Sequence, residues 1–212
     1  MAHSGIEVLF QGKNFLRLMG GLWTSVWIAG VSLGFGLLLG TFLGVLRTLK
    51  NAVLRVVLRL YLEFFRIVPT IVLLFLVYYI LPRRFHIEVS AEWMAVLAFS
   101  LWISAEFSDI VRGALESVPK HQREAGLALG LTQGQLFVHV LMPQAFMLEL
   151  PAAINLATRV INVGQQIIEA NNQQYPSGVF WIYGFIFMLY FIVDYPLSLI
   201  SKMLQQKFSA NL

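Results

Sequence analysis

The chain has 212 residues, of which 58% are hydrophobic and 12% are charged, whereas soluble domains carry about 25% charged residues. So apolar a chain excludes one water-soluble core and predicts an all-α integral membrane protein with lipid around much of its surface. The net charge of +4 does not indicate nucleic-acid binding, because the basic residues flank apolar runs, where they usually set membrane orientation. Cysteine is absent, which excludes disulfides and thiolate chemistry.

Residues 1–12 stand apart from the rest of the chain. The stretch at 7–12 reads Glu-Val-Leu-Phe-Gln-Gly and resembles the recognition site of a viral 3C protease that removes purification tags. Such a segment does not belong in fold reasoning. We therefore expect the native chain to start near Lys13, without a cleavable signal peptide.

Five apolar segments approach the length of about 20 residues that a membrane-spanning helix needs. They run over about 18–46, 56–81, 91–115, 146–161 and 179–204. Glycines four apart lie on one helix face and let another helix approach closely. We therefore expect a packing seam in the first segment, within the chain or against another subunit, formed by Gly30, Gly34, Gly36, Gly40 and Gly44.

The basic residues predict the orientation. If the chain crosses the membrane five times, four basic residues lie on one side of the membrane, namely Lys13, Arg17, Arg83 and Arg84. Nine lie on the other side, namely Arg47, Lys50, Arg55, Arg59, Arg112, Lys120, Arg123, Lys202 and Lys207. Because cytoplasmic loops carry the excess of Lys and Arg, we expect the N-terminus outside and the C-terminus in the cytoplasm.

The polar segment at about 116–144 contains the most specific motif. It reads Glu-Ala-Gly at 124–126, Gly at 130 and Val-Leu-Met-Pro at 140–143. This spacing resembles the EAA loop of ABC importer permeases, although that family usually has alanine, isoleucine and leucine where this chain has Gly126, Val140 and Met142. Further matches extend the resemblance to the polar amino-acid branch of the family, at 63–69, 112–113, 117–120 and 128–132.

The resemblance implies the transmembrane domain of a type I importer for a polar amino acid, in a bacterial inner membrane. In such permeases the EAA loop forms a short coupling helix lodged in a groove of a cytoplasmic ATPase. It assigns ATPase coupling to Glu124, Ala125, Gly126, Leu129 and Gly130. The implied partners are two ABC ATPase subunits, a second permease chain, identical or homologous, and an external solute-binding protein.

The residues of the loop suit a docked helix. Pro119 can start a helix, where its missing N–H is not needed, and Gly130 can end one, while leucines at 127, 129 and 131 supply apolar anchors. The sequence contains no G-x-x-x-x-G-K-[ST] phosphate loop, the signature of nucleotide binding. We therefore expect ATP and magnesium to bind the partner subunit, and this chain to be no enzyme.

Ionisable residues within the spans are costly and usually face the bundle interior or a cavity. Glu63 and Arg66 are three apart in the second span and can pair on one helix face, which we favour over a substrate contact. Pro69 follows and can kink the helix. Asp109 and Arg112 in the third span match residues that the family usually carries, which indicates a structural pair.

Three further polar residues are candidates for the substrate pathway. Glu106 lies where the family more often has an aromatic residue. It either attracts the amino group or cationic side chain of the substrate or pairs with another buried polar group, and the second alternative is slightly favoured. Asn155 and Arg159, four apart in the fourth span, are comparable candidates.

The fourth apolar segment is too short for a span, since it holds only sixteen mixed residues from Phe146 to Ile161. Members of the resembled family continue here with a further stretch. We therefore expect the sequence to skip on the order of fifteen residues between Ile161 and Asn162. An uninterrupted helix across that bond would contradict the skip.

Two other functional classes compete with the importer. A secondary transporter or channel driven by an ion gradient would suit the intramembrane acids, but it does not need the EAA spacing. A membrane-embedded enzyme would need a convergent nucleophile, metal or acid–base set. The histidines, at 3, 86, 121 and 139, include no i, i+4 metal pair.

Overall fold

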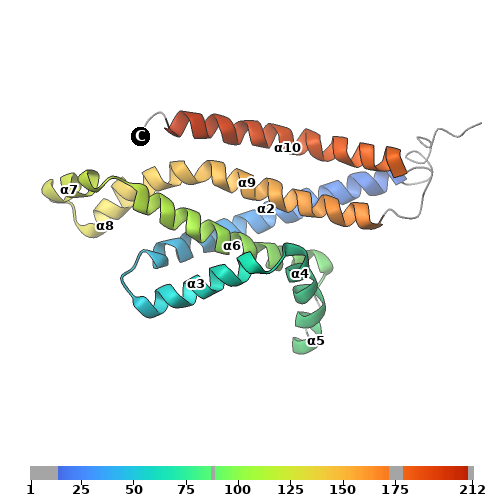
Figure 1. The fold of residues 1–212 in the computed structure, drawn as a ribbon, viewed down its shortest axis with the longest axis horizontal. Coiled ribbons are helices and arrows are strands. Elements are labelled where there is room, and N and C mark those ends of the chain that lie inside the picture. Colours follow the sequence, from blue (N-terminus) through green and yellow to red (C-terminus); the bar gives the residue numbers. More distant parts are fainter. Residues whose placement is uncertain (1–13, 87–88, 172–178, 210–212) are drawn as a thin grey trace, which may run out of the picture.

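The computed structural model describes residues 14–86, 89–171 and 179–209, and every regular element in these ranges is a helix (Figure 1). In chain order the elements are α2 (Asn14–Arg47), α3 (Ala52–Ile67), α4 (Thr70–Phe75), the π-helical turn η1 (Leu76–Ile80), α5 (Leu81–Phe85), α6 (Ala91–Ser117), α7 (Lys120–Ala128), α8 (Gln133–Leu136), the π-helical turn η2 (Phe137–Leu141), α9 (Met142–Asn171) and α10 (Val179–Ser209). The proposed tag, at 1–12, lies outside the described residues. The predicted all-α class is confirmed.

The number of spans follows from helix length and apolar character. Four stretches are long and apolar enough to cross a membrane, at 15–47, 91–117, 133–162 and 183–207. A fifth span requires α3 and the α4–α5 segment to be taken together, although they are bent by 103°. The expected five spans are thus present only if this bent pair counts as one.

The break in the second span lies at Pro69. Val68 is extended there, with φ −75° and ψ 120°, because the ring of a following proline disfavours the α conformation. Pro69 then precedes the first residue of α4, and its carbonyl accepts a bond of 3.0 Å from the amide of Leu73. The predicted kink is therefore a full break, after which α4 and α5 turn away from the long helices (Figure 1).

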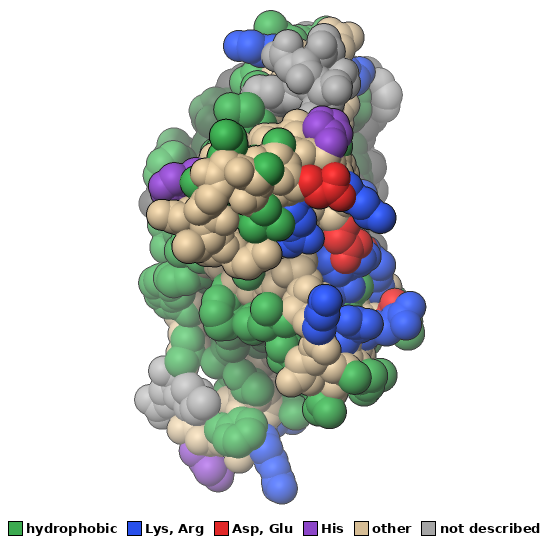
Figure 2. Space-filling model, turned by 90° about the vertical axis from the view of Figure 1, so that its left-hand side faces the viewer, with side chains coloured by type: hydrophobic (Ala, Val, Ile, Leu, Met, Phe, Trp, Pro, Cys, Tyr) green, Lys and Arg blue, Asp and Glu red, His purple; other side chains and the backbone are tan. Residues whose placement is uncertain are grey.

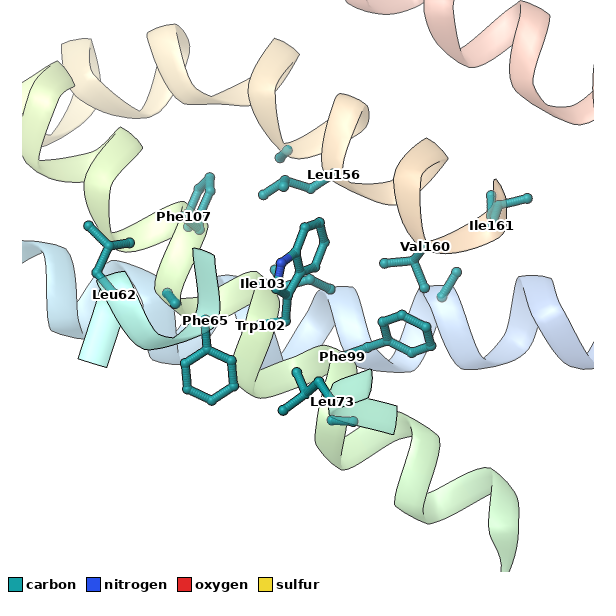
Figure 3. Packing of buried hydrophobic residues seen from close by; sticks show 14 of the residues in the cluster. Leu62, Phe65, Leu73, Phe99, Trp102, Ile103, Phe107, Leu156, Val160 and Ile161 are labelled. Carbon is teal, nitrogen blue, oxygen red and sulfur yellow. The ribbon is translucent and has the colours of Figure 1, made fainter. Parts of the chain in front are cut away.

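Helix α6 forms the centre of the bundle and packs against α2, α3, α4 and α9. It is the most buried of the candidate spans, and Ile103, Ala105 and Val111 have no exposed surface. In Figure 3, side chains of α6 lie between those of α3 and α9, as seen for Phe65, Trp102, Ile103, Phe107 and Leu156. The other long helices keep large apolar side chains exposed, as lipid-facing helices do.

The predicted glycine seam joins α2 to α6. A Cβ atom added at Gly36, Gly40 or Gly44 would come within 2.5–2.9 Å of the Cβ atoms of Ile103, Phe107 and Val111, respectively. Only glycine allows so close an approach of the two backbones. Gly30 and Gly34 do not belong to this seam, since nothing lies within 4 Å of a Cβ atom placed there.

The fourth span begins earlier than the sequence predicted. It starts at Gln133 and includes α8, η2 and the first part of α9, so the end of the polar segment expected at about 116–144 belongs to the span. Thr132 caps α8 in a capping box with Gln135, which starts the helix there. Ile161 and Asn162 follow one another within α9, an outcome that speaks against a skipped segment.

Candidate functional site

The predicted coupling segment forms a short helix, α7, at one end of the bundle (Figure 1). Pro119 precedes its first residue, as expected. At its end, Gly130 has a positive φ of 84°, and the amides of Gly130 and Leu131 bond to the carbonyls of Leu127 and Gly126 at 3.0 and 3.1 Å. This pair of bonds is the Schellman motif, which stops a helix at a left-handed residue.

The surface of α7 separates the five predicted coupling residues into two groups. Glu124, Ala125, Leu129 and Gly130 are exposed, and Leu129 keeps 84% of its surface free. Gly126 is instead buried, because its α-carbon faces Leu136 of α8. Leu136 has no exposed surface and occupies the space that an alanine methyl group at 126 would need, which explains the departure from the family pattern.

Helix α7 is tied to the fourth span by a second contact. The side-chain carbonyl of Gln122 accepts a hydrogen bond of 2.6 Å from Nε2 of Gln144 at the start of α9. Together with the packing of Gly126 on Leu136, this bond joins both faces of the α7–α8 turn to the membrane helix. A displacement of α7 would therefore be passed on to α9.

A charged junction, formed by the side chains around Asp109, joins three helices near the same end. Asp109 of α6 pairs with Arg47 of α2 at 3.0 Å, with Arg66 of α3 at 2.9 Å and with Arg112 of α6 at 3.2 Å. Arg112 also reaches Glu116 at 2.6 Å. Carboxylate–guanidinium hydrogen bonds are stronger than neutral ones, so Asp109 fixes the mutual position of α2, α3 and α6.

The junction corrects one prediction and confirms another. Arg66 does not pair with Glu63 on its own helix, because its guanidinium points across to α6 and bonds Asp109 and, at 3.4 Å, Glu106. The predicted pair of Asp109 with Arg112 is present. Glu106 is thus paired with Arg66 of another helix, but that side chain is 39% exposed and is not the buried partner that was slightly favoured. No sequence pattern indicated a place in this junction for Arg47, which was expected only as an orientation residue.

The remaining pathway candidates lie elsewhere. Asn155 and Arg159 are exposed on α9, and within the described residues no hydrogen bond or ion pair connects them to Glu106 or Arg66. Glu63 is exposed on α3. The structure therefore brings Glu106 and Arg66 together and leaves the other three apart. Among the described residues, no group of three His, Asp or Glu side chains could hold a metal ion.

Known proteins resemble this chain over nearly its whole length. The family described as "binding-protein-dependent transport system inner membrane component" matches residues 36–209. The L-cystine transport system permease protein TcyB of Bacillus subtilis (strain 168) is 29% identical, over 94% of this chain and 89% of that protein. The probable amino-acid ABC transporter permease protein YckA of the same organism is 35% identical, over 73% of this chain and 70% of that protein.

Solved structures share the fold. A crystal structure of an amino acid ABC transporter with histidines matches with a TM-score of 0.79 at 22% identity, over 98% of this chain and 100% of that chain. The MetNI methionine ABC transporter in an inward-facing conformation matches with a TM-score of 0.76 at 20% identity, over 93% and 99%. The family match and the permease relatives do not favour an ion-gradient-driven transporter. The chain belongs to the family of inner membrane components of binding-protein-dependent transport systems, the permease subunits of ABC importers.

Proposed function

We propose that this permease subunit imports a polar amino acid and that α7 is its contact with the ATPase. The observation that carries the proposal is the surface of α7. Leu127 and Leu129 are exposed by 40% and 84% on a helix that also carries Lys120, Arg123 and Glu124. Apolar side chains with a polar rim are the composition of a protein interface. The names of TcyB and YckA, which refer to L-cystine transport and to amino acids, support the substrate class.

We propose that the ATPase drives transport by moving α7, which contacts the fourth span through Gln122 and Gly126. ATP binding and hydrolysis in two ATPase subunits, which hold the nucleotide and its magnesium, would move α7. The bond from Gln144 to Gln122 and the packing of Leu136 on Gly126 would pass that movement to α9. A second permease chain, identical or homologous, would complete the pathway, and an external solute-binding protein would deliver the amino acid.

The orientation is part of this proposal. An ATPase contact requires α7 to lie on the cytoplasmic side, and with it the α2–α3 turn, which lies at the same end (Figure 1). Figure 2 views this end of the molecule and shows basic and acidic side chains gathered along one side of it. The larger number of basic residues on this side in the sequence supports the positive-inside assignment, with the N-terminus outside and the C-terminus in the cytoplasm.

Co-purification with the ATPase tests the proposed contact. We expect Leu129→Asp to abolish ATPase retention and ATP-driven uptake, because a charge cannot enter an apolar groove. Leu49→Asp is the matched control, since Leu49 is also exposed, by 48%, and follows α2 at the same end. Normal retention in both variants would refute the role of α7. Stimulation of ATP hydrolysis by individual amino acids, measured in the reconstituted complex, would identify the substrate.

Glu106 is the pathway residue with the clearest geometry. Its side chain is 19% exposed and lies 3.4 Å from Arg66, so it is accessible while paired. We propose that a cationic group of the substrate competes with Arg66 for this carboxylate. We also propose that Glu63, Asn155 and Arg159 contact the substrate elsewhere along the pathway. Unchanged uptake of every amino acid by a Glu106→Gln variant would refute the role of Glu106.

A further inference from the structure

A cavity of about 380 Å³ opens beside the charged junction, where α2 ends and α3 begins. Its walls come from three elements, α2 with the turn after it, α3 and α6, and its lining consists of Arg47, Thr48, Arg55, Arg59, Arg112 and Glu116. Four guanidinium groups thus face one space, with a single carboxylate in the wall. Neither the proposed ATPase contact nor the proposed pathway uses this cavity.

The positive charges of this cavity are only partly neutralised. Arg47 and Arg112 pair with Asp109, and Arg112 also pairs with Glu116. Arg55 and Arg59 make no ion pair with any described residue. These two arginines lie four residues apart in α3, on one face of the helix, so the cavity presents two uncompensated guanidinium groups side by side.

Guanidinium groups in this arrangement select an anion of a particular kind. The planar fork of arginine matches the oxygens of a phosphate or carboxylate with two parallel hydrogen bonds. Two forks on one side of a cavity, with the hydroxyl of Thr48 on its wall, suit a tetrahedral group that accepts from several directions. A phosphate fits these donors best.

The exposed surface of α3 indicates which class of phosphate compound would fit the cavity. Large apolar side chains, exposed by 50–77%, recur every three or four residues along a separate exposed face of α3, which borders Arg59 only at Val56. They are Val53, Val56, Val57, Leu60, Phe64 and Ile67. A charged head beside a continuous apolar strip is the chemistry of a phospholipid. An acidic protein surface would match the arginines but would bury this strip against polar groups, at a cost.

The depth of the cavity agrees with a lipid headgroup. Arg47 is the last residue of the first span, and Arg112 and Glu116 lie in the last two turns of the third. Side chains at the ends of spans lie in the headgroup region, where the phosphates of the bilayer are. Basic pockets between transmembrane helices bind such headgroups.

We propose that the cavity between α2, α3 and α6 binds the phosphate of an anionic membrane lipid, held by Arg55 and Arg59, with its acyl chains along the exposed apolar face of α3. Arg47, Thr48 and Arg112 line the other walls of the cavity, so a phosphate on Arg55 and Arg59 also lies against the ends of α2 and α6. It therefore adds a lipid-dependent restraint on the position of α3. The proposal does not require that α7 contact the ATPase.

The test uses the full chain, purified into nanodiscs that contain equal amounts of phosphatidylglycerol and phosphatidylcholine. Native mass spectrometry measures the phosphatidylglycerol retained by each chain after its release into detergent. Each arginine near the membrane surface contributes about fivefold in affinity, so we expect the Arg55→Gln, Arg59→Gln double variant to bind phosphatidylglycerol roughly thirtyfold more weakly. The matched control is Arg83→Gln with Arg84→Gln, two arginines in α5, which should retain the lipid as the wild type does.

Three results would overturn the proposal. The double variant could retain as much phosphatidylglycerol as the wild type. In nanodiscs of phosphatidylcholine alone, inorganic phosphate could bind to the wild type but not to the double variant, and displace no lipid. That result would assign the cavity to a free anion. The double variant could also lose the ATPase while keeping the lipid, which would assign the two arginines to the protein partner. Both arginines are exposed, so their substitution should leave the fold intact, and an unchanged melting temperature in phosphatidylcholine checks this.

Discussion

Arg66 of α3 and Asp109 of α6 form an ion pair, with 2.9 Å between Nη2 and Oδ2, across 43 residues of sequence. The same carboxylate also pairs with Arg47 at the end of α2. One acidic side chain therefore connects the central helix of the bundle with two of its neighbours. Asp109 lies eight residues before the end of α6, after which α7 begins.

The first prediction concerns Asp109→Asn, which removes the charge and keeps the volume. Arg47, with a side chain only 8% exposed, would keep a hydrogen bond to Ser108 but lose its carboxylate. Hydrogen bonds to charged groups contribute about 1.5–3 kcal/mol, and because Asp109 is 25% exposed we expect a loss near the lower end. Thermal unfolding in a neutral detergent measures the effect.

Glu116→Gln provides the control for this variant. It breaks the pair with Arg112, but the Glu116 side chain is 55% exposed, and exposed pairs contribute about 0–1 kcal/mol. The melting temperature should therefore fall clearly less than for Asp109→Asn. Equal shifts in the two variants would show that Asp109 does not hold the helices together.

The second prediction concerns the glycine seam. In Gly44→Ala the new Cβ would lie 2.5 Å from Cβ of Val111 and 2.8 Å from the carbonyl oxygen of Ser108, so α2 and α6 must move apart, at a cost of about 1–3 kcal/mol. Gly34→Ala on the same helix meets nothing within 4 Å and should be neutral or stabilise by up to about 1 kcal/mol. Similar melting temperatures for the two alanine variants would contradict the seam.

The third prediction concerns Gly126 and Leu136. Gly126→Ala places a methyl group on the δ-carbon of Leu136, and since Leu136 is fully buried we expect a loss of about 1 kcal/mol. Leu136→Val removes that δ-carbon and should relieve the overlap. The double variant should then lose less stability than the two single changes together, as a double-mutant cycle measures. Strictly additive losses would mean that the two residues do not meet.

Local patterns in the sequence predicted the features that depend on one helix alone. The spacing of Gly36, Gly40 and Gly44 predicted a packing seam, because residues four apart share a face whatever the partner helix is. Pro69 predicted an interruption, because its ring constrains the residue before it. Neither pattern specified the partner or the angle, since the choice of α6 and the bend of 103° depend on contacts with distant residues.

The partner of Arg66 could not be predicted in this way. The spacing from Glu63 allows a pair within α3, but it says nothing about a carboxylate that the fold brings from α6. The start of the fourth span was different, because Thr132 and Gln135 form a Ser/Thr-x-x-Glu/Gln signature in the sequence. That signature marks a helix start, and it is the signal from which the beginning of the span could have been predicted.

The last prediction concerns the end of α7. Gly130 has φ of 84°, and nothing lies within 4 Å of the position that an added Cβ atom would take. The cost of Gly130→Ala is therefore the backbone strain alone, about 1–2 kcal/mol for a left-handed alanine. Asparagine tolerates this conformation better, so Gly130→Asn should lose clearly less. The Schellman turn sets the direction of α7, so the amount of ATPase that co-purifies should follow the stability of the variants. The Gly130→Ala variant should retain less ATPase than Gly130→Asn, and Gly130→Asn no more than the wild type. Full retention by the alanine variant, with an unchanged melting temperature, would show that the turn does not need a left-handed residue.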